Sequence, residues 1–205
     1  MSERNPPVVV VGASSSGLFA ATLLAQAGIP VQVYERLDAI RPADRTLIVT
    51  PELCRTLGFS PESAIRQEVH TLELCASGTS FPLRLEEPDL IIERSKLIRL
   101  LASRAEMAGA DIRFGQRFVG IQSAGRYAAL TFRDRSCDVT RRVVARAVIA
   151  ADGALSRVLS CVGASPLPLN SPAWARNSQP LWRLPRAPQA ARTSRAYVRP
   201  ANPYA

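Results

Sequence analysis

The fold of this chain is decided by the stretch PVVVVGASSSGLFAATLLAQAGIPVQVYER, which occupies residues 7–36. Its β-branched run, residues 7–11, predicts a short, buried parallel strand. A glycine-rich turn follows, and residues 18–27 then predict a helix that a glycine and a proline end. Residues 31–34 predict a second strand, which leads directly into Glu35. Strand, glycine-rich turn, helix, strand and acid in this order are typical of a dinucleotide-binding βαβ unit.

The residue types of this unit suit a pyrophosphate. Gly12 lets the chain turn sharply off the strand, and Gly17 lets the helix pack close to the sheet. The dipole of the helix contributes only about 0.3–1 kcal/mol to pyrophosphate binding. Hydrogen bonds from the unpaired N–H groups of the first turn therefore supply most of the binding. Ser14 replaces the middle glycine of the G-x-G-x-x-G pattern, and its hydroxyl is an alternative donor to phosphate. Glu35 stands where a carboxylate accepts from ribose hydroxyls. For the unit as a whole, the alternative is a plain βαβ core that binds nothing.

Length and composition indicate a globular protein without a membrane segment. The chain has 205 residues, enough for one domain or one domain and part of a second, and a formal charge of +9. Its longest apolar runs fall short of the roughly 18 residues of a membrane span. The first five residues lack the apolar core of a signal peptide, so we expect a cytoplasmic protein.

Cysteine and histidine usage argues against several kinds of site. The four cysteines are scattered without C-x-x-C spacing, which favours reduced structural thiols over zinc ligands or a disulfide framework. His70 is the single histidine, so a Ser-His-Asp site, a Cys-His site or a histidine-rich metal site is not expected.

The middle of the chain alternates between β-rich segments and one clear helix. Two β-rich excursions are predicted, around residues 60–92 and 117–146, the second with a turn at residues 134–136. Between them, residues 94–110 have helical spacing of Leu97, Leu101, Ala105 and Ala108, and Gly109 ends that helix.

A second informative stretch is AVIAADGALSR, residues 147–157. An apolar strand runs into Asp152, which places a carboxylate at the carboxyl end of a strand, where open α/β sheets bind ligands. Gly153 permits a sharp turn or a close backbone approach. The alternative is an ordinary strand-turn-helix in which the aspartate caps the helix.

These segments together resemble FAD-dependent oxidoreductases of the group that contains aromatic-ring hydroxylases and geranylgeranyl reductases. The resemblance rests on the GASSSG turn with Glu35-Arg36, on the helix from Arg94 into Gly109-Ala110-Asp111-Ile112, and on AADGALS at residues 150–156. It covers about residues 8–162, and the Asp-Gly motif favours FAD over NAD.

The resemblance implies a set of FAD contacts. The glycine-rich turn would hold the pyrophosphate, and the end of the second strand would hold the adenosine ribose. Arg94 would approach the phosphates, Val119 would meet the adenine through its backbone, and the Asp-Gly pair would border the flavin. A solvated surface charge is the alternative for each of the two arginines. The candidates are Gly12, Ala13, Ser14, Ser16, Gly17, Glu35, Arg36, Arg94, Val119, Asp152 and Gly153.

The expected fold class is α/β, a Rossmann-like three-layer FAD/NAD(P)-binding domain with an inserted β-rich segment, spanning residues 1–162. Residues 163–205 change character, because they are rich in proline and arginine and contain no acid. We expect an incomplete substrate domain or a disordered tail there. The chain also departs from the resembling enzymes, because it lacks their late Gly-Asp motif.

The function that follows is an FAD-binding oxidoreductase, either a flavoprotein reductase or a monooxygenase, acting on an apolar or aromatic small molecule. NAD(P)H is a candidate reductant, and no side chain is assigned to catalysis because the flavin carries the chemistry. A truncated FAD-binding fragment without turnover and an NAD-binding Rossmann module are the alternatives. No nucleic-acid partner is expected, although two tryptophans stand among the arginines of the tail.

Overall fold

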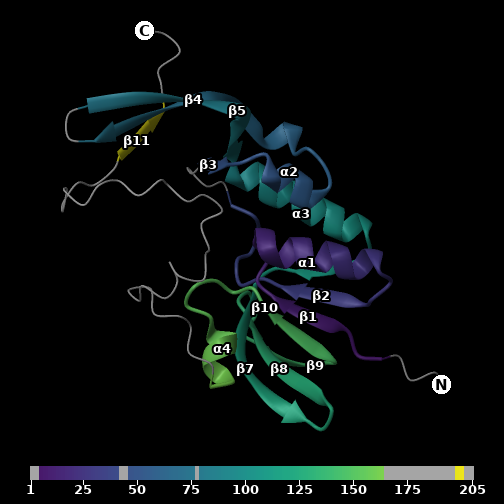
Figure 1. Ribbon diagram of the computed structural model, residues 1–205. Helices are drawn as coiled ribbons and strands as arrows, with labels where there is room; N and C mark the ends of the chain where they lie inside the picture. The colour runs from purple at the N-terminus through teal and green to yellow at the C-terminus, as the bar shows by residue number, and fades with distance from the viewer. Residues whose placement is uncertain (1–4, 42–45, 77–78, 164–196, 201–205) are drawn as a thin grey trace. The chain divides into compact units, whose positions relative to one another are not determined.

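A computed structural model describes residues 5–41, 46–76, 79–163 and 197–200 of the chain (Figure 1). The chain divides into two compact units. The first unit combines residues 1–42 and 95–175, and the second combines residues 43–94 and 176–205. The division predicted at residue 162 stays a prediction.

A four-stranded parallel sheet forms the centre of the first unit. Its strands are β1 (Val8–Val11), β2 (Val31–Tyr34), β6 (Asp111–Arg113) and β10 (Ala147–Ala150), in the spatial order β10-β1-β2-β6. The β-branched valines of β1 are all buried, as expected for a strand covered on both faces. The chain leaves β1 toward β2 on one side and later returns to its other side as β10. The strand order therefore reverses between β1 and β10, which is where open α/β sheets bind ligands.

Helix α1 (Ser15–Gln26) packs on β1 and β2 through a face that includes Leu18 and Ala21. It begins three residues earlier than the sequence predicted, because the N–H of Leu18 already donates to the carbonyl of Ser14 at 2.9 Å. Helix α3 (Arg94–Met107) has the predicted apolar stripe and ends three residues before the predicted limit.

A three-stranded antiparallel sheet forms a further layer of the first unit. It contains β7 (Gln116–Ala124), β8 (Tyr127–Asp134) and β9 (Thr140–Ala145), paired in that order. In Figure 1 this sheet lies against the parallel strands on the side opposite α1. The short helix α4 (Arg157–Cys161) follows β10 and contacts β7.

Side chains from both sheets and α4 share one hydrophobic core. Its buried members are Val9, Val11, Tyr34, Phe118, Leu130, Phe132, Ala145 and Val158. Helix, parallel sheet and antiparallel sheet thus form three layers, which confirms the predicted α/β class and the inserted β-rich segment.

The second unit is built on a four-stranded antiparallel sheet. Its strands, in spatial order, are β11 (Tyr197–Pro200), β4 (Ile65–Ala76), β5 (Thr79–Glu93) and β3 (Thr46–Val49). The long hairpin of β4 and β5 confirms the β-rich excursion predicted around residues 60–92, while residues 77–78 of its turn lie outside the described residues. Strand β11, which pairs with β4 along the edge opposite β5, was not predicted. Between β3 and β4 the chain forms the helix α2 (Glu52–Leu57) and the 3-10 turn η1 (Glu62–Ala64).

Among the described residues, no helix combines the length and the apolar character that crossing a lipid bilayer requires.

Candidate functional site

Gly12 begins the site at the carboxyl end of β1. Its φ of +107° is a conformation that residues with a Cβ rarely adopt. A Cβ on Gly12 would also lie 2.3 Å from the carbonyl oxygen of Ala151, the residue that follows β10. Both the sharp turn and the close approach of the two strand ends therefore require glycine here.

Gly17, in the first turn of α1, lies against the same two segments, at Gly12 and Ala151. A Cβ there would lie 2.0 Å from the carbonyl oxygen of Gly12 and 3.1 Å from the Cβ of Ala151. The Ala151 N–H donates to the carbonyl of Val11 at 2.9 Å, which extends the pairing of β1 and β10 by one residue. The glycine-rich turn, the amino end of α1 and the segment after β10 thus meet at the point where the strand order reverses.

The amino end of α1 has the properties of an anion site. The first N–H groups of an α-helix have no partner within the helix. At α1 no side chain caps them and no acidic residue stands in the first turn. These N–H groups and the positive end of the helix dipole favour a phosphate. Ser14 has a φ of −90° and an extended backbone, so a serine fits the position of the middle glycine without strain. Ala13 is buried beside it.

Glu35 ties the end of β2 to the glycine-rich turn. Its Oε2 accepts from the N–H of Ala13 at 2.8 Å, and its Oε1 accepts from the N–H of Leu37 at 2.9 Å. Each oxygen of a carboxylate has a second lone-pair site, so both remain able to accept from a ligand hydroxyl. The sequence predicted the ribose role of this side chain but not its two backbone partners.

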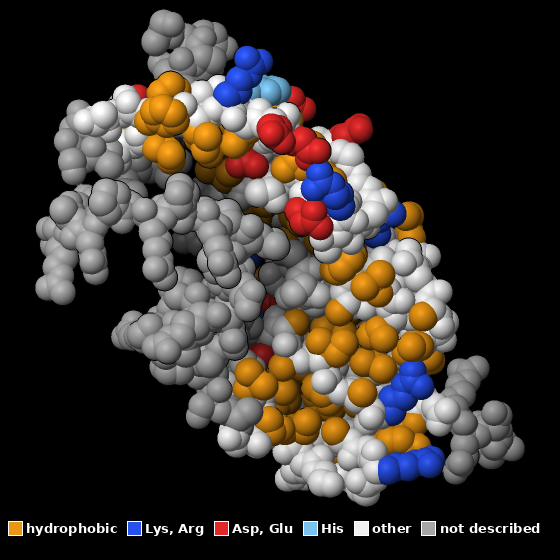
Figure 2. Space-filling model, viewed as in Figure 1, with side chains coloured by type: hydrophobic (Ala, Val, Ile, Leu, Met, Phe, Trp, Pro, Cys, Tyr) orange, Lys and Arg blue, Asp and Glu red, His pale blue; other side chains and the backbone are white. Residues whose placement is uncertain are grey.

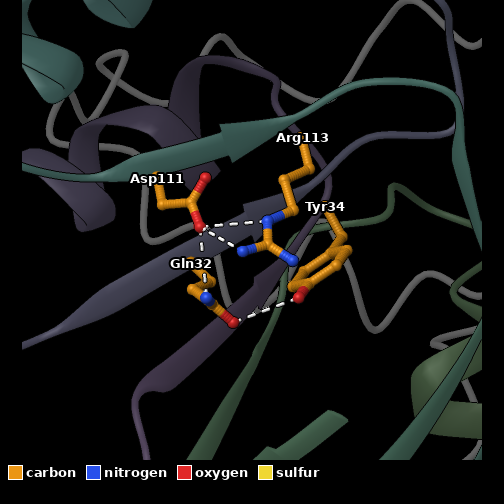
Figure 3. A network of polar contacts seen from close by, with 4 residues as sticks. All are labelled: Gln32, Tyr34, Asp111 and Arg113. Carbon is orange, nitrogen blue, oxygen red and sulfur yellow. Dashed lines mark hydrogen bonds and ion pairs between the residues drawn. The ribbon is translucent and has the colours of Figure 1, made fainter. Parts of the chain in front are cut away.

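A polar network holds β2 to β6 just before Glu35 (Figure 3). Arg113 donates to Asp111 at 2.6 and 3.0 Å, and Gln32 donates to the same carboxylate at 3.1 Å. The hydroxyl of Tyr34 donates to Gln32 at 3.0 Å, and the Arg113 guanidinium lies 5.6 Å from the centre of the Tyr34 ring. These contacts orient the edge of the sheet from which Glu35 extends.

Tyr34 also packs into the core below this network. It is 1% exposed and stacks on Phe132 with 4.0 Å between the ring centres. Burial raises the pKa of the Tyr34 phenol, which keeps it protonated and able to donate. The residue before Glu35 is therefore anchored by the core and by the hydrogen bond of its hydroxyl.

Asp152 serves as a cap of α4. Its Oδ1 accepts from the hydroxyl of Ser156 at 2.5 Å, and its Oδ2 accepts from the N–H groups of Arg157 at 2.7 Å and Val158 at 3.2 Å. Gly153 is exposed, has a φ of +96°, and has no atom within 4 Å of where a Cβ would stand. The aspartate thus shapes a loop whose open backbone a ligand can approach.

The remaining candidates lie in three different settings. Val119 is 43% exposed, and a register shift between Phe118 and Gly120 leaves it without a paired residue on β8. Arg36 is exposed beyond the end of β2. Arg94 begins α3 and belongs to the second unit, so its phosphate contact stays a prediction.

Within the described ranges, no cluster of side chains is suited to metal binding or to thiol chemistry. No group of three or more His, Cys, Asp or Glu side chains there could hold a metal ion, and the four cysteines are free thiols. His70 is exposed, with its Nε2 3.4 Å from a Glu68 oxygen.

The sequence reasoning missed the part that Ala151 plays. Its small side chain and carbonyl contact both glycines of the turn, although it lies more than 130 residues away in the sequence. The two alanines before Asp152 were the available signal, because a close approach of backbones requires small residues.

Comparison with known proteins agrees with this geometry. The sequence profile of a family described as an FAD binding domain matches residues 5–177. The chain is 30% identical over 168 residues to a 4-methyl-5-nitrocatechol 5-monooxygenase of Burkholderia sp, covering 72% of this chain and 31% of that protein. It is 31% identical over 163 residues to digeranylgeranylglycerophospholipid reductase 1 of Methanopyrus kandleri, covering 78% of this chain and 42% of the relative.

Solved structures show the same fold. A geranylgeranyl bacteriochlorophyll reductase-like protein from Thermoplasma acidophilum superposes with a TM-score of 0.69 at 25% identity, over 78% of this chain and 42% of that one. An aklavinone-11 hydroxylase, solved with FAD and aklavinone, gives a TM-score of 0.64 at 25% identity, over 80% and 36% of the two chains. The chain spans about a third to two fifths of the length of these proteins.

Proposed function

Because the chain belongs to the FAD binding domain family, we propose that it holds FAD at the β1–β10 switch point and works as a flavin-dependent oxidoreductase. The observation that carries the proposal is the meeting of Gly12, Gly17 and Ala151 at this point of strand reversal. The uncapped amino end of α1 lies directly beside that contact.

The residues present fit FAD in their chemistry. The first-turn N–H groups of α1 suit the pyrophosphate, with Ala13, Ser14 and Ser16 of the same turn beside it. Glu35 accepts from ribose hydroxyls through its remaining lone pairs, while the Ala13 N–H keeps its carboxylate in place. The exposed backbone at Gly153 borders the flavin end. Arg36, Arg94 and the backbone of Val119 supply phosphate and adenine contacts.

The bound flavin supplies electron transfer to or from the substrate, and the protein supplies orientation and electrostatics. The described residues bind and orient the cofactor, and no side chain among them is assigned to the reaction itself. NAD(P)H is the proposed reductant of the flavin.

We assign an apolar or aromatic small molecule as the substrate. Two of the relatives act, by their names, on a nitrocatechol and on a geranylgeranylated lipid. In the second unit, the cross-strand pairs Leu72–Leu83 and Leu74–Phe81 put apolar side chains on one face of the β4–β5 hairpin. Leu74, Phe81 and Leu83 are exposed there, and Figure 2 shows hydrophobic side chains gathered over this end of the second unit. An exposed apolar face of this kind supports an apolar ligand. A cytoplasmic location is part of the same proposal.

The visible absorption spectrum of the purified chain, before and after FAD is added, tests the proposal. We expect an oxidised-flavin spectrum that survives gel filtration and that a candidate reductant bleaches. Glu35→Ala is the matched variant, because it removes an acceptor without touching the glycine contacts, and FAD affinity should fall about 10- to 100-fold.

Three other results would count against the proposal. Retained NAD without flavin would favour a nicotinamide module, and bound FAD that no reductant or substrate reduces or reoxidises would favour a binding fragment without turnover. Unchanged FAD affinity in Glu35→Ala would remove the ribose assignment.

A further inference from the structure

We infer that the hydrogen bond between Gln116 and Asp134 positions Glu35, so that two residues outside the glycine-rich motif determine how well the adenosine end of FAD is held. The inference rests on the proposed function for its ligand. Its structural part concerns only contacts within the first unit.

The backbone of Glu35 is held on both sides by the turn between β6 and β7. Its N–H donates to the carbonyl of Arg113 at 2.9 Å, and its carbonyl accepts from the N–H of Gln116 at 2.8 Å. The N–H of Gly115, in the middle of that turn, donates to the carbonyl of Leu37 at 2.8 Å. The direction in which the Glu35 carboxylate points therefore depends on the geometry of residues 113–116.

The side chain of Gln116 fixes this turn in place. It is only 8% exposed, and its Nε2 donates to Oδ2 of Asp134 at 2.6 Å. A second bond, from the N–H of Arg135 to the carbonyl of Gly115 at 2.9 Å, ties the same turn to the loop between β8 and β9. That loop thus supports the β6–β7 turn, which in turn supports Glu35.

Asp134 is the last residue of β8, in register with Gln116, and the loop that follows holds its carboxylate. Its Oδ1 accepts from the N–H of Ser136 at 2.8 Å and from the hydroxyl of Ser136 at 2.6 Å. The hydroxyl of Ser136, the N–H of Ser136 and the amide of Gln116 hold the pKa of Asp134 well below its usual range. The carboxylate stays ionised at working pH, so the Gln116 amide faces it with its N–H group.

Gln116 has a further feature that makes the bond testable. Its Oε1 is buried and has no hydrogen-bond partner within the part of the chain that the structure describes. In Asp134→Asn, the Gln116 amide can rotate so that Oε1 accepts from the new amide, and the contact is kept. In Gln116→Glu, two carboxylates would face each other, and the contact would return only when one of them is protonated.

The test combines amide exchange with FAD titration. Exchange at the N–H groups of Ala13 and Leu37, which donate to Glu35, reports its position without any cofactor. We expect Gln116→Ala to speed both about tenfold and to weaken FAD binding about tenfold. Gln122→Ala, an exposed glutamine on the same strand, should change neither.

A double-mutant cycle and a pH profile separate positioning from general destabilisation. The effect of Gln116→Ala on FAD affinity should disappear in the Glu35→Ala background, since the first residue acts through the second. Asp134→Asn should keep near-wild-type affinity. In Gln116→Glu the affinity for FAD should rise as the pH falls. In the wild-type protein the affinity for FAD should stay constant between pH 5 and 8.

Each failure has its own meaning. Unchanged exchange at Ala13 and Leu37 in Gln116→Ala, or additive effects in the cycle, would overturn the positioning role. Faster exchange with no change in FAD affinity would leave the positioning of Glu35 standing and would overturn the assignment of Glu35 to FAD.

Discussion

At the scale of single residues, the site depends on two glycines for reasons of space. A Cβ at Gly12 would collide with the carbonyl of Ala151, and a Cβ at Gly17 would collide with the carbonyl of Gly12. Ser14, by contrast, has an extended backbone that any residue adopts. The motif therefore tolerates serine at its middle position and not at its ends.

Gly17→Ala tests this account. We expect the free energy of unfolding to fall by about 1–3 kcal/mol, because backbone on both sides must move to admit a methyl group. Chemical denaturation measures the change. Gly120→Ala is the control, since open space surrounds that position and its φ is not positive. Equal destabilisation in both variants would contradict the steric argument.

At the scale of elements, the loop after β10 is organised by its aspartate. Asp152 accepts three hydrogen bonds from the start of α4, and the hydroxyl of Ser156 accepts one more from the N–H of Leu159 at 3.1 Å. A helix of five residues has little intrinsic stability, so these caps hold it in place. The Asp-Gly motif thus acts through the shape that it gives the loop.

Asp152→Ala should lower the free energy of unfolding by about 1–2 kcal/mol, because it leaves two N–H groups of α4 without their acceptor. Ser156→Ala should have a smaller effect. It removes the acceptor of the Leu159 N–H and the donor to Oδ1 of Asp152, but it leaves the bonds from Arg157 and Val158 to the aspartate intact. Thermal unfolding of the two variants compares them. A stability loss larger in Ser156→Ala than in Asp152→Ala would show that the serine is the main cap.

At the scale of the whole molecule, the proposed FAD contacts are concentrated in the first unit. The glycine-rich turn, Glu35, Val119 and the loop at Gly153 all belong to it, while Arg94 belongs to the second. The second unit carries the exposed apolar face of the β4–β5 hairpin. Apart from Arg94, the division separates the residues proposed for the cofactor from those that favour an apolar ligand.

Saturation with FAD should therefore protect the two units unequally. At a free FAD concentration of 100 times Kd, binding adds about 2.7 kcal/mol to the stability of the folded state that binds it. Hydrogen exchange should slow at residues 12–17 and 35–37 and stay unchanged in the β4–β5 hairpin. Equal slowing in the hairpin would show that FAD contacts or orders the β4–β5 hairpin as well.

The sequence by itself determined the βαβ unit, the later strands other than β3 and β11, and the FAD family. A continuous β-branched run, glycine at turns and an acid after a strand are local patterns, so Val8–Val11, Gly12 and Glu35 could be assigned without the fold. Only the tertiary structure decided that Ala151 contacts both glycines, that Glu35 accepts from Ala13 and Leu37, and that Gln116 binds Asp134. Most of these contacts join segments that strand order brings together, and a local pattern does not specify which distant strand becomes a neighbour. The pairing of β11 with β4 escaped the sequence for the same reason.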